Sequence, residues 1–388
     1  MTTRVITNIS ELTTNDPTIG DCSALGRLFD AALVIDDERV LWVGANADAP
    51  DGDDVLDAQG CAVIPGFVDS HTHLVFAGER SDEFEARMQG VHYDGGGIER
   101  TVAASRAATN DQLRDGTRKR VNELFAGGVT TVEIKSGYEL TIEGEKRELE
   151  IASEFSDEVT WLGAHVVPPE YKASRDAYID LVVTSMLEAC APKAKWADVF
   201  CDRGAFSVDE AREVLTSARA KGLAPRLHAN QLDHSDAIAL AVELDCASVD
   251  HCTYIDDRDI DLLSGSATVA TLLPGAEFST RSPYPSARRM LDAGVTVALA
   301  TDCNPGSSYV TSMAFVIAIA VREMAMSVDE ALFASTKGGA LALRRDDVGF
   351  LGVGARADFA ILDAPRAAHL AYRPGGNVVA STHRARRS

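Results

Sequence analysis

Short apolar stretches alternate with longer segments of helical periodicity along the middle of this chain of 388 residues. One such segment is 208–222, whose apolar residues recur on one helical face and whose Gly222 favours a stop. This alternation predicts parallel strands joined by helical crossovers. Eight units favour a closed (β/α)8 barrel, although a doubly wound open sheet gives a similar pattern. The strand-like stretches are 66–74, 129–138, 159–168, 197–204, 224–231, 247–254, 268–274 and 295–304.

The positions of the polar clusters favour the barrel over the open sheet. Nearly all of them fall at the carboxyl end of a strand-like stretch. In a barrel these ends converge on one face, where active sites of this architecture lie. The sequence therefore predicts one site built from many strand ends. The clusters are 69–73, 135–138, His165, 202–203, His228, His251 and 302–304.

The two ends of the chain are rich in short β-like stretches. Residues 31–45 show a hairpin pattern around the turn 36–39, and residues 349–354 lead into 357–363 as a comparable pair. We therefore expect both ends to share one small β domain and the middle to form the barrel, which usually has about 250 residues. The predicted domains are 1–63 with 345–388, and 64–344.

The formal charge of −22 makes the chain a poor partner for nucleic acid or anionic membranes, and an anionic substrate would need local cations. Adaptation to high salt is another source of such acidity. No stretch of about 18 uncharged apolar residues predicts a membrane span, and residues 1–8 lack an export pattern. The seven cysteines show no CxxC pair, which indicates reduced thiols. We expect a cytoplasmic protein, and a homodimer from symmetry statistics alone.

His71 and His73 stand two residues apart at a strand end, so both imidazoles project to the same side and can share one ion. His228 ends the fifth strand-like stretch and Asp302 the eighth, and a closed barrel brings both toward the first. Three imidazoles and one carboxylate, with room for water, suit zinc or iron. The sequence predicts one Zn²⁺ or Fe²⁺/Fe³⁺ ion per chain. Satisfied polar residues lining a cleft are the alternative.

Such a site predicts metal-assisted hydrolysis. Asp302 can bind the ion through one carboxylate oxygen and take a proton from water with the other. His251, at the end of the sixth stretch, can stabilise an oxyanion or carry a proton. We therefore expect Asp302 and His251 to be catalytic residues of a hydrolase.

Several separated motifs occur in a fixed order along the chain. Pro65–His73 and the distant pair Thr301–Asp302 form one pattern. With these residues the chain resembles the amidohydrolase superfamily over essentially its full length. Further motifs make it closely similar to one group of that superfamily, the imidazolonepropionase family of histidine degradation. These narrower motifs are His73–Arg80, Gly95–Ile98, Glu133–Tyr138, Leu162–His165 and Asp302–Ser307.

The resemblance implies hydrolysis of 4-imidazolone-5-propanoate at its lactam carbonyl, which gives N-formimidoyl-L-glutamate. It also implies a β-sandwich formed by both termini. Arg80 would bind the small anionic substrate, because its forked guanidinium suits the propionate carboxylate in so acidic a chain. The contacts that the resemblance implies are Arg80, Tyr138 and His165 with the substrate, and Asn304, Gly306 and Ser307 with substrate or product.

The segment after His228 departs from the family pattern. Residues 229–231 read Ala-Asn-Gln, where many relatives carry a carboxylate two or three residues beyond the histidine. A neutral amide cannot act as a general base, so proton transfer is assigned to Asp302 and His251. Gln231 is left to orient the ring of the substrate.

Other functions stay open on the sequence alone. Lys135 lies near a strand end, where a carbamylated lysine bridges two metals in binuclear members of the superfamily. Another mononuclear amidohydrolase, such as an aminohydrolase of a purine or pyrimidine ring, is the main alternative enzyme. Arg80 distinguishes the two enzymes, because only a substrate with an anionic arm requires this cation. A non-catalytic assembly protein is a third reading, although such scaffolds typically lack the metal ligands that this chain retains.

Overall fold

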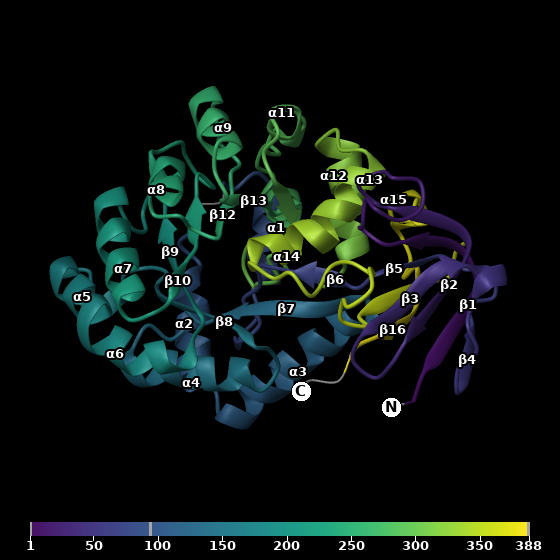
Figure 1. The fold of residues 1–388 in the computed structure, drawn as a ribbon. Coiled ribbons are helices and arrows are strands. Elements are labelled where there is room, and N and C mark those ends of the chain that lie inside the picture. Colours follow the sequence, from purple (N-terminus) through teal and green to yellow (C-terminus); the bar gives the residue numbers. More distant parts are fainter. Residues whose placement is uncertain (1, 93–94, 386–388) are drawn as a thin grey trace. The chain divides into compact units, whose positions relative to one another are not determined.

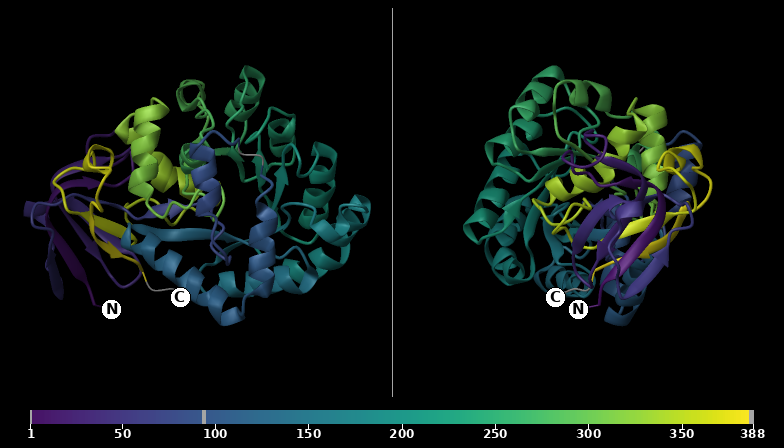
Figure 2. Two further views of the ribbon diagram at one scale, coloured as in Figure 1. Left: turned by 180° about the vertical axis from the view of Figure 1, so that it is seen from behind. Right: turned by 45° about the vertical axis from the view of Figure 1, so that its right-hand side comes forward.

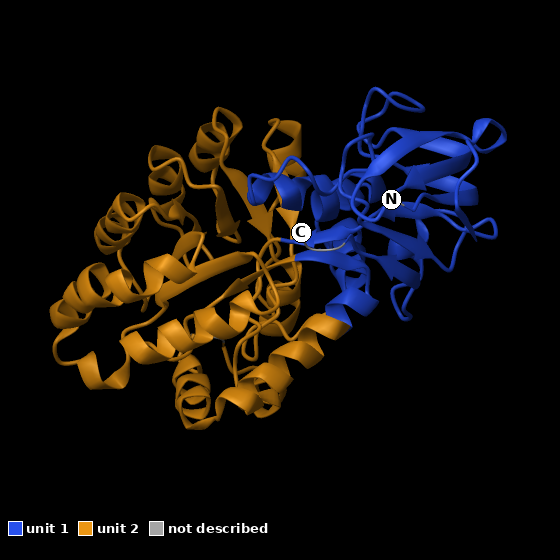
Figure 3. Ribbon diagram, turned by 60° about the horizontal axis from the view of Figure 1, so that its bottom comes forward, with its two compact units in different colours: residues 1–69, 123–131, 312–388 blue, residues 70–122, 132–311 orange. Residues whose placement is uncertain are grey.

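The computed structural model describes residues 2–92 and 95–385 of the chain (Figures 1 and 2). Its internal contacts divide it into two compact units, drawn in blue and orange in Figure 3. The predicted ligands and substrate contacts all fall in the second unit. The first unit contains Met1–Asp69, Glu123–Thr131 and Ser312–Ser388, and the second contains Ser70–Asn122 and Val132–Thr311.

The first unit is built on a branched sheet that joins both ends of the chain. Among the described residues its strands follow the order β16-β15-β5-β1-β2-β3, and β4 pairs with β1. β1 runs antiparallel to β2 but parallel to β4 and β5, and Ile9, Leu33 and Phe359 lie in the core. This sheet is consistent with the predicted β-sandwich. The strands are β1 (Arg4–Thr13), β2 (Arg27–Ile35), β3 (Val40–Ala45), β4 (Asp54–Asp57), β5 (Val63–Pro65), β15 (Phe359–Leu362) and β16 (Val379–His383).

The two terminal hairpin predictions have different outcomes. The first is confirmed, because β2 and β3 pair antiparallel on either side of 36–39. The second is wrong: β15 pairs with β5 and β16 instead of with residues 349–354. Gly349 and Gly354 have φ values of 76° and 89°, a turn conformation that interrupts a strand. The predicted domain boundaries differ from those of the contact-based units and stay a prediction.

Each of the predicted strand-like stretches overlaps a strand of one parallel sheet, and β8 and β9 begin one residue earlier than predicted. The sheet order among the described residues is β14-β13-β12-β11-β9-β8-β7-β6, with β10 paired to β9. β10 and β11 are two parts of one stretch, interrupted at Arg226. The strands are β6 (Phe67–Asp69), β7 (Val129–Lys135), β8 (Glu158–Ala164), β9 (Trp196–Cys201), β10 (Ala224–Pro225), β11 (Leu227–Ala229), β12 (Ser248–His251), β13 (Val269–Leu272) and β14 (Val297–Leu299).

The segments that follow the first and last strands of this sheet pair with each other. Thr72 and Cys303 form a parallel bridge. The Asp302 N–H donates to the His71 carbonyl at 3.1 Å, and the His73 N–H donates to the Cys303 carbonyl at 3.0 Å. An open doubly wound sheet has two distant edges, whereas here the edges meet. The prediction of a (β/α)8 barrel is confirmed, and the pairing sets two predicted ligand segments side by side.

The predicted crossover helix over 208–222 is confirmed as α7. It begins with a capping box, in which Ser207 and Glu210 each accept the backbone N–H of the other, and Gly222 follows its end at φ 89°. The helices are α1 (Ser81–Met88), α2 (Ile98–Ala107), α3 (Asn110–Ala126), α4 (Ile142–Ser153), α5 (Arg175–Leu181), α6 (Leu187–Cys190), α7 (Val208–Ala220), α8 (Ala237–Glu243), α9 (Asp257–Ser264), α10 (Pro274–Thr280), α11 (Ala287–Asp292), α12 (Met313–Glu323), α13 (Val328–Phe333), α14 (Gly339–Ala342) and α15 (His369–Tyr372). Short 3-10 or π segments are Asn46–Asp48, Pro169–Tyr171, Val182–Met186, Ala191–Lys193 and Ala334–Gly338.

The predictions about the cysteines and about membrane spans can be compared with the structure. All seven cysteines lie within the described residues, and none of them forms a disulfide. None of the helices in the described ranges combines the length and the apolar character that crossing a bilayer requires.

Candidate active site

Four side chains that were predicted as ligands meet at the carboxyl ends of the barrel strands. His71 and His73 follow β6, His228 lies in β11, and Asp302 follows β14. The Nε2 atom of His73 lies 3.3 Å from that of His71 and 3.4 Å from that of His228. Oδ1 of Asp302 lies 3.5 Å from His71 Nε2 and 3.6 Å from His73 Nε2. All four side chains are buried.

These separations fit donor atoms around a cation. Two overlapping groups have all their donor atoms within 4.8 Å of one another, namely His71 with His73 and Asp302, and His71 with His228 and His251. Atoms bound about 2.1 Å from a tetrahedral ion lie about 3.4 Å apart. Nδ1 of His71 lies 2.8 Å from Asp250 Oδ2, and Nδ1 of His228 lies 3.0 Å from Asp198 Oδ2. The two carboxylates place the imidazole protons on Nδ1, so the lone pairs on Nε2 face one another. Such lone pairs repel, and a positive ion between them removes the repulsion.

The two supporting carboxylates keep their charge although both are fully buried. Burial alone would raise the pKa of Asp198, but His228 and Lys135 outweigh it and hold this pKa below its ordinary value. Burial also acts to raise the pKa of Asp250, and Arg226 and Lys135 lower it overall. Both groups are therefore ionised at neutral pH, which strengthens each imidazole as a donor to metal.

A layer of buried charges lies next to this centre, inside the barrel. Lys135 Nζ lies 2.9 Å from Glu133 Oε1 and 2.9 Å from Asp198 Oδ2. Arg226 donates to the Ser70 carbonyl at 2.7 Å and lies 3.4 Å from Asp250. Of these charged residues, only Lys135 was considered individually from the sequence. The others could have been suspected because each is a charged residue within an apolar strand-like stretch, and a buried charge requires a partner.

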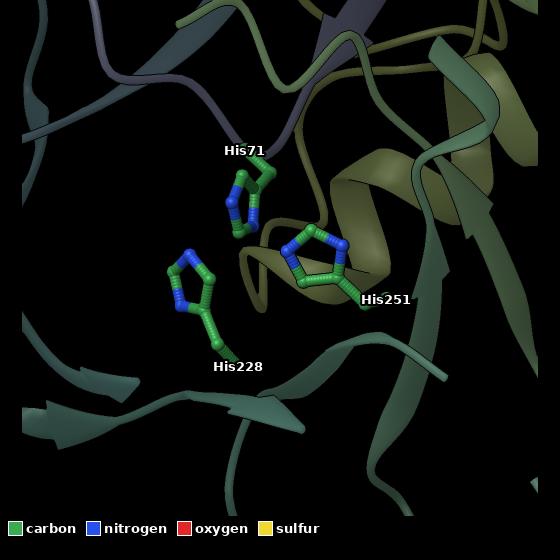
Figure 4. A group of neighbouring side chains, drawn as sticks. All are labelled: His71, His228 and His251. Carbon is green, nitrogen blue, oxygen red and sulfur yellow. The ribbon is translucent and has the colours of Figure 1, made fainter. Parts of the chain in front are cut away.

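His251 completes the cluster of imidazoles. Figure 4 shows the rings of His71, His228 and His251 approaching one another from three separate segments. The His251 ring centroid lies 5.7 Å from that of His71 and 5.4 Å from that of His228. Burial lowers the pKa of His251 well below its ordinary value. The ring is therefore neutral, so it can donate or accept one proton.

The backbone at three strand ends adopts conformations that are uncommon for residues with side chains. His251, Asp302 and Asn230 have φ values of 81°, 51° and 55°. Each conformation costs about 1 kcal/mol or more and persists only when its surroundings impose it. The neighbouring carboxylates and the barrel closure supply that constraint here. Strain concentrated at one face of the barrel is typical of a functional site.

A pocket opens over this cluster, with an empty volume of about 350 Å³. Its lining is largely polar and carries several imidazoles, which suits a small polar ligand. Its lining includes every predicted site residue except His71 and Gly306. Its lining residues are His73, Arg80, Ile98, Tyr138, His165, Phe200, His228, Gln231, His251, Asp302, Asn304 and Ser307.

Arg80 occupies a slot that leaves little space on either side. Its Nε and Nη2 atoms donate to Glu83 at 3.0 Å and 2.7 Å, and Nη1 donates to Thr101 at 3.3 Å. A Cβ at Gly306 would lie 2.4 Å from Nη1, and one at Gly97 would lie 2.1 Å from Nη2. Both positions therefore require glycine for the guanidinium to fit. The slot holds the cation at 4% exposure on the pocket wall.

Tyr138 and His165 form an adjoining wall of the pocket. The His165 ring stacks on that of His73 at 5.5 Å between centroids, and Tyr138 lies 5.3 Å from His165. His165 Nδ1 lies 2.9 Å from the Gly137 carbonyl oxygen, which places the ring proton on Nδ1. Burial lowers the pKa of His165 to about 3. This neutral ring therefore offers Nε2 as a hydrogen-bond acceptor.

The loop after Asp302 is organised by one amide side chain. Asn304 Oδ1 accepts the N–H groups of Gly306 and Ser307, both at 2.8 Å. Asn304 Nδ2 donates to the Asp302 carbonyl at 2.7 Å and to Ser307 Oγ at 2.9 Å. Ser307 Oγ lies 3.5 Å from Asp302 Oδ2. The loop therefore fixes the orientation of Asp302, in addition to lining the pocket.

Comparison with known proteins shows the family to which this chain belongs. Residues 62–383 match the amidohydrolase family. The imidazolonepropionase of Mycolicibacterium smegmatis is 59% identical over 384 residues, which cover 99% of this chain and 97% of that protein. That of Salinispora arenicola is 60% identical over 377 residues, with coverage of 97% and 96%. The chain belongs to the imidazolonepropionase family of amidohydrolases. The resemblance predicted from the sequence motifs is confirmed.

Solved structures share the fold at low sequence identity. A mutant atrazine chlorohydrolase from Arthrobacter aurescens TC1, complexed with zinc and atraton, aligns with a TM-score of 0.72 at 17% identity, covering 98% of this chain and 94% of that chain. Guanine deaminase from C. acetobutylicum aligns with a TM-score of 0.73 at 14% identity, covering 98% of both chains. These similarities confirm the amidohydrolase type of fold for the barrel and its β domain.

The departure after His228 has a structural counterpart. Gln231 lines the pocket, and its backbone N–H donates to Asp202 Oδ2 at 2.7 Å. A neutral amide thus stands at the pocket position where the family pattern predicted a carboxylate. Lys135, by contrast, is held between two carboxylates, and a carbamate there would add a third negative charge to them. This arrangement argues against the binuclear alternative.

Proposed function

We propose that this chain hydrolyses the lactam C–N bond of 4-imidazolone-5-propanoate, a step in the degradation of L-histidine to L-glutamate. The product is N-formimidoyl-L-glutamate. The observation that carries this proposal is the identity of 56–60% to imidazolonepropionases across nearly the whole chain. The pocket supports it, because its buried arginine suits an anionic arm and its imidazole cluster suits hydrolysis.

We infer that His71, His73, His228 and Asp302 hold one Zn²⁺ or Fe²⁺/Fe³⁺ ion. Support comes from the spacing of their donor atoms and from the carboxylates behind two of the imidazoles. An ion bound there supplies Lewis acidity, which lowers the pKa of water and polarises a carbonyl. Both metals accept this donor set.

Proton transfer falls to Asp302 and His251 in this proposal. Asp302 takes a proton from the attacking water and delivers it to the ring nitrogen as the C–N bond breaks. The water oxygen forms the new bond to the carbonyl carbon, which becomes the carboxylate of the product. Neutral His251 donates a hydrogen bond to the carbonyl oxygen while negative charge develops on it.

The other pocket residues orient the substrate. Arg80 pairs with the propionate carboxylate, and Tyr138 and His165 bind polar atoms of the ring or the arm. Gln231 orients the ring by hydrogen bonding. Asn304, Gly306 and Ser307 contact substrate or product through their loop. The free thiols suit a reducing cytoplasm, where we place this activity, and a homodimer stays a prediction.

Incubation of the purified protein with fresh imidazolone propionate tests the function directly. The ring absorbance is expected to decay, to persist after chelation of the metal, and to decay again once Zn²⁺ or Fe²⁺ is restored. Elemental analysis should find one ion per chain. A metal-loaded protein that leaves the absorbance unchanged would remove the proposed reaction, while two bound ions would remove the mononuclear site.

Arg80→Ala is expected to lower kcat/KM on imidazolone propionate by about 30- to 150-fold, because a charge-assisted hydrogen bond contributes about 2–3 kcal/mol. Metal content should stay at the wild-type value. Arg100→Ala is the matched control, since Arg100 also contacts Glu83 but is exposed. Equal activity of both variants would favour the alternative substrate class, an uncharged nucleobase.

Gln231→Glu is expected to leave kcat within about threefold and to raise KM, because it adds a negative charge beside an anionic substrate. The pH-rate profile should keep its shape, since Asp302 and His251 carry the proton. A large gain in kcat at unchanged KM would instead show that the missing carboxylate limits the reaction in this chain.

A further inference from the structure

Two buried glutamates on α4 face the loop that carries Tyr138. Glu148 Oε2 accepts the N–H groups of Gly137 and Tyr138, at 2.9 Å and 3.0 Å. Glu145 Oε1 accepts the N–H groups of the next two residues, at 3.3 Å and 2.8 Å. Four successive backbone donors are thus received by two carboxyl groups one helical turn apart. Both glutamate side chains have 0% exposure.

Glu148 also acts on the neighbouring wall of the pocket through the peptide that joins Gly137 to Tyr138. The Tyr138 N–H of this peptide donates to Glu148 Oε2 at 3.0 Å, and its Gly137 carbonyl oxygen accepts from His165 Nδ1 at 2.9 Å. Gly137 has a φ of 113°, a conformation that L side chains rarely adopt. A Cβ there would lie 3.0 Å from His165 Nδ1 and 3.0 Å from the Leu162 carbonyl oxygen. The position of this peptide therefore sets the orientation of the His165 ring.

We propose that Glu148 is a positioning residue for the substrate, which acts on Tyr138 and His165 without touching the ligand. Its carboxyl oxygen fixes the two peptides on either side of Gly137, and these peptides fix one phenol and one imidazole on the pocket wall. This inference rests on the proposed function, in which those two side chains bind the substrate.

An acceptor oxygen is the feature of Glu148 that this role requires. Burial, followed by the charges of Glu145 and Glu139, raises the pKa of Glu148 well above its ordinary value. Protonated or ionised, the carboxyl has an oxygen that accepts both N–H groups. Glutamine has the same length and offers the same oxygen, whereas methionine fills a similar volume without it.

The test compares Glu148→Gln, Glu148→Met and wild type on imidazolone propionate. Glu148→Met is expected to raise KM by about 10- to 30-fold, with kcat within about threefold and metal content unchanged, because two buried N–H groups lose their acceptor and the loop shifts. Glu148→Gln should stay within about threefold of wild type in both constants. Glu150→Ala on the same helix is exposed and should change neither.

A double-mutant comparison identifies the route of the effect. In a background with Tyr138→Phe and His165→Ala, Glu148→Met should add less than about threefold to KM, because the groups it positions are gone. An equal increase in both backgrounds, an unchanged KM in Glu148→Met, or a loss in Glu148→Gln as large as in Glu148→Met would overturn the proposal. If Glu148→Met does not fold, Glu148→Asp replaces it, and its shorter side chain should raise KM to an intermediate value. Wild-type activity tests the proposed function separately.

Discussion

Asp302→Asn is expected to lower kcat by about 10³- to 10⁴-fold, the largest effect of any single change in this chain. The amide cannot take a proton from water, and it removes the one negative charge among the four donor atoms. Asp302 combines a position 3.5 Å from His71 Nε2 with a loop that fixes its second oxygen, and no other carboxylate of residues 2–92 and 95–385 shows this combination. The rate should be measured at saturating metal, so that weaker metal binding does not contribute.

Ser307→Ala is a matched control for Asp302→Asn. It removes the hydroxyl 3.5 Å from Asp302 Oδ2 but keeps the carboxylate, so kcat should fall by less than about tenfold. Metal content of both variants is determined by elemental analysis. An Asp302→Asn protein that is fully metal-loaded and retains more than about a tenth of the wild-type kcat would show that another group carries the proton.

The barrel was predictable because its signal is repeated along the chain. All of the strand-like stretches except 268–274 ended at a polar cluster, and the same pattern appears as a ring of strand ends in the structure. The small β domain was harder to predict from the sequence. In β1 and β16 the order of buried and exposed residues is too irregular for the sequence to assign them as strands. The pairing of β15 with β5 also joins positions about 300 residues apart.

The predicted ligands were recognisable because His71 and His73 stand two apart at a strand end, and strand ends meet in any closed barrel. Their supporting carboxylates were not recognisable in the same way. Asp198 and Asp250 lie within strands, and the sequence does not say which imidazole each one faces. That information comes from the lateral order of the strands.

Glu145 and Glu148 illustrate a different limit of the sequence. Within α4 they resemble the acidic face of an ordinary surface helix, and nothing in their spacing indicates burial. Their role appears only once the Tyr138 loop folds back over the helix and presents its N–H groups. Backbone donors have no sequence signature, so a carboxylate that serves them is found only from coordinates.

Lys135→Met is expected to lower the free energy of unfolding by about 3–5 kcal/mol, the cost of removing one partner of a buried ion pair. Lys135 lies 2.9 Å from both Glu133 and Asp198, and all three side chains are fully buried. Burial acts to lower the pKa of Lys135, but Asp198 and Glu133 raise it above its ordinary value. A raised lysine pKa means that the stabilisation is fully present at neutral pH and is lost only as the pH rises through the folded-state pKa.

The measurement is guanidinium denaturation of the metal-free protein at neutral pH, compared with Lys193→Met. Lys193 pairs with Glu150 at 3.6 Å on the surface, so the control makes the same change in net charge and should cost less than about 1 kcal/mol. Adding Glu133→Gln to Lys135→Met should recover part of the loss, because it removes a charge left without its cation. Equal stability of the Lys135 and Lys193 variants would contradict the prediction.

Lys135→Met should also weaken metal binding. Asp198 pairs with Lys135 and lies 3.0 Å from His228 Nδ1, so losing the lysine disturbs a carboxylate that orients a proposed metal ligand. Metal affinity should fall by about 10- to 100-fold.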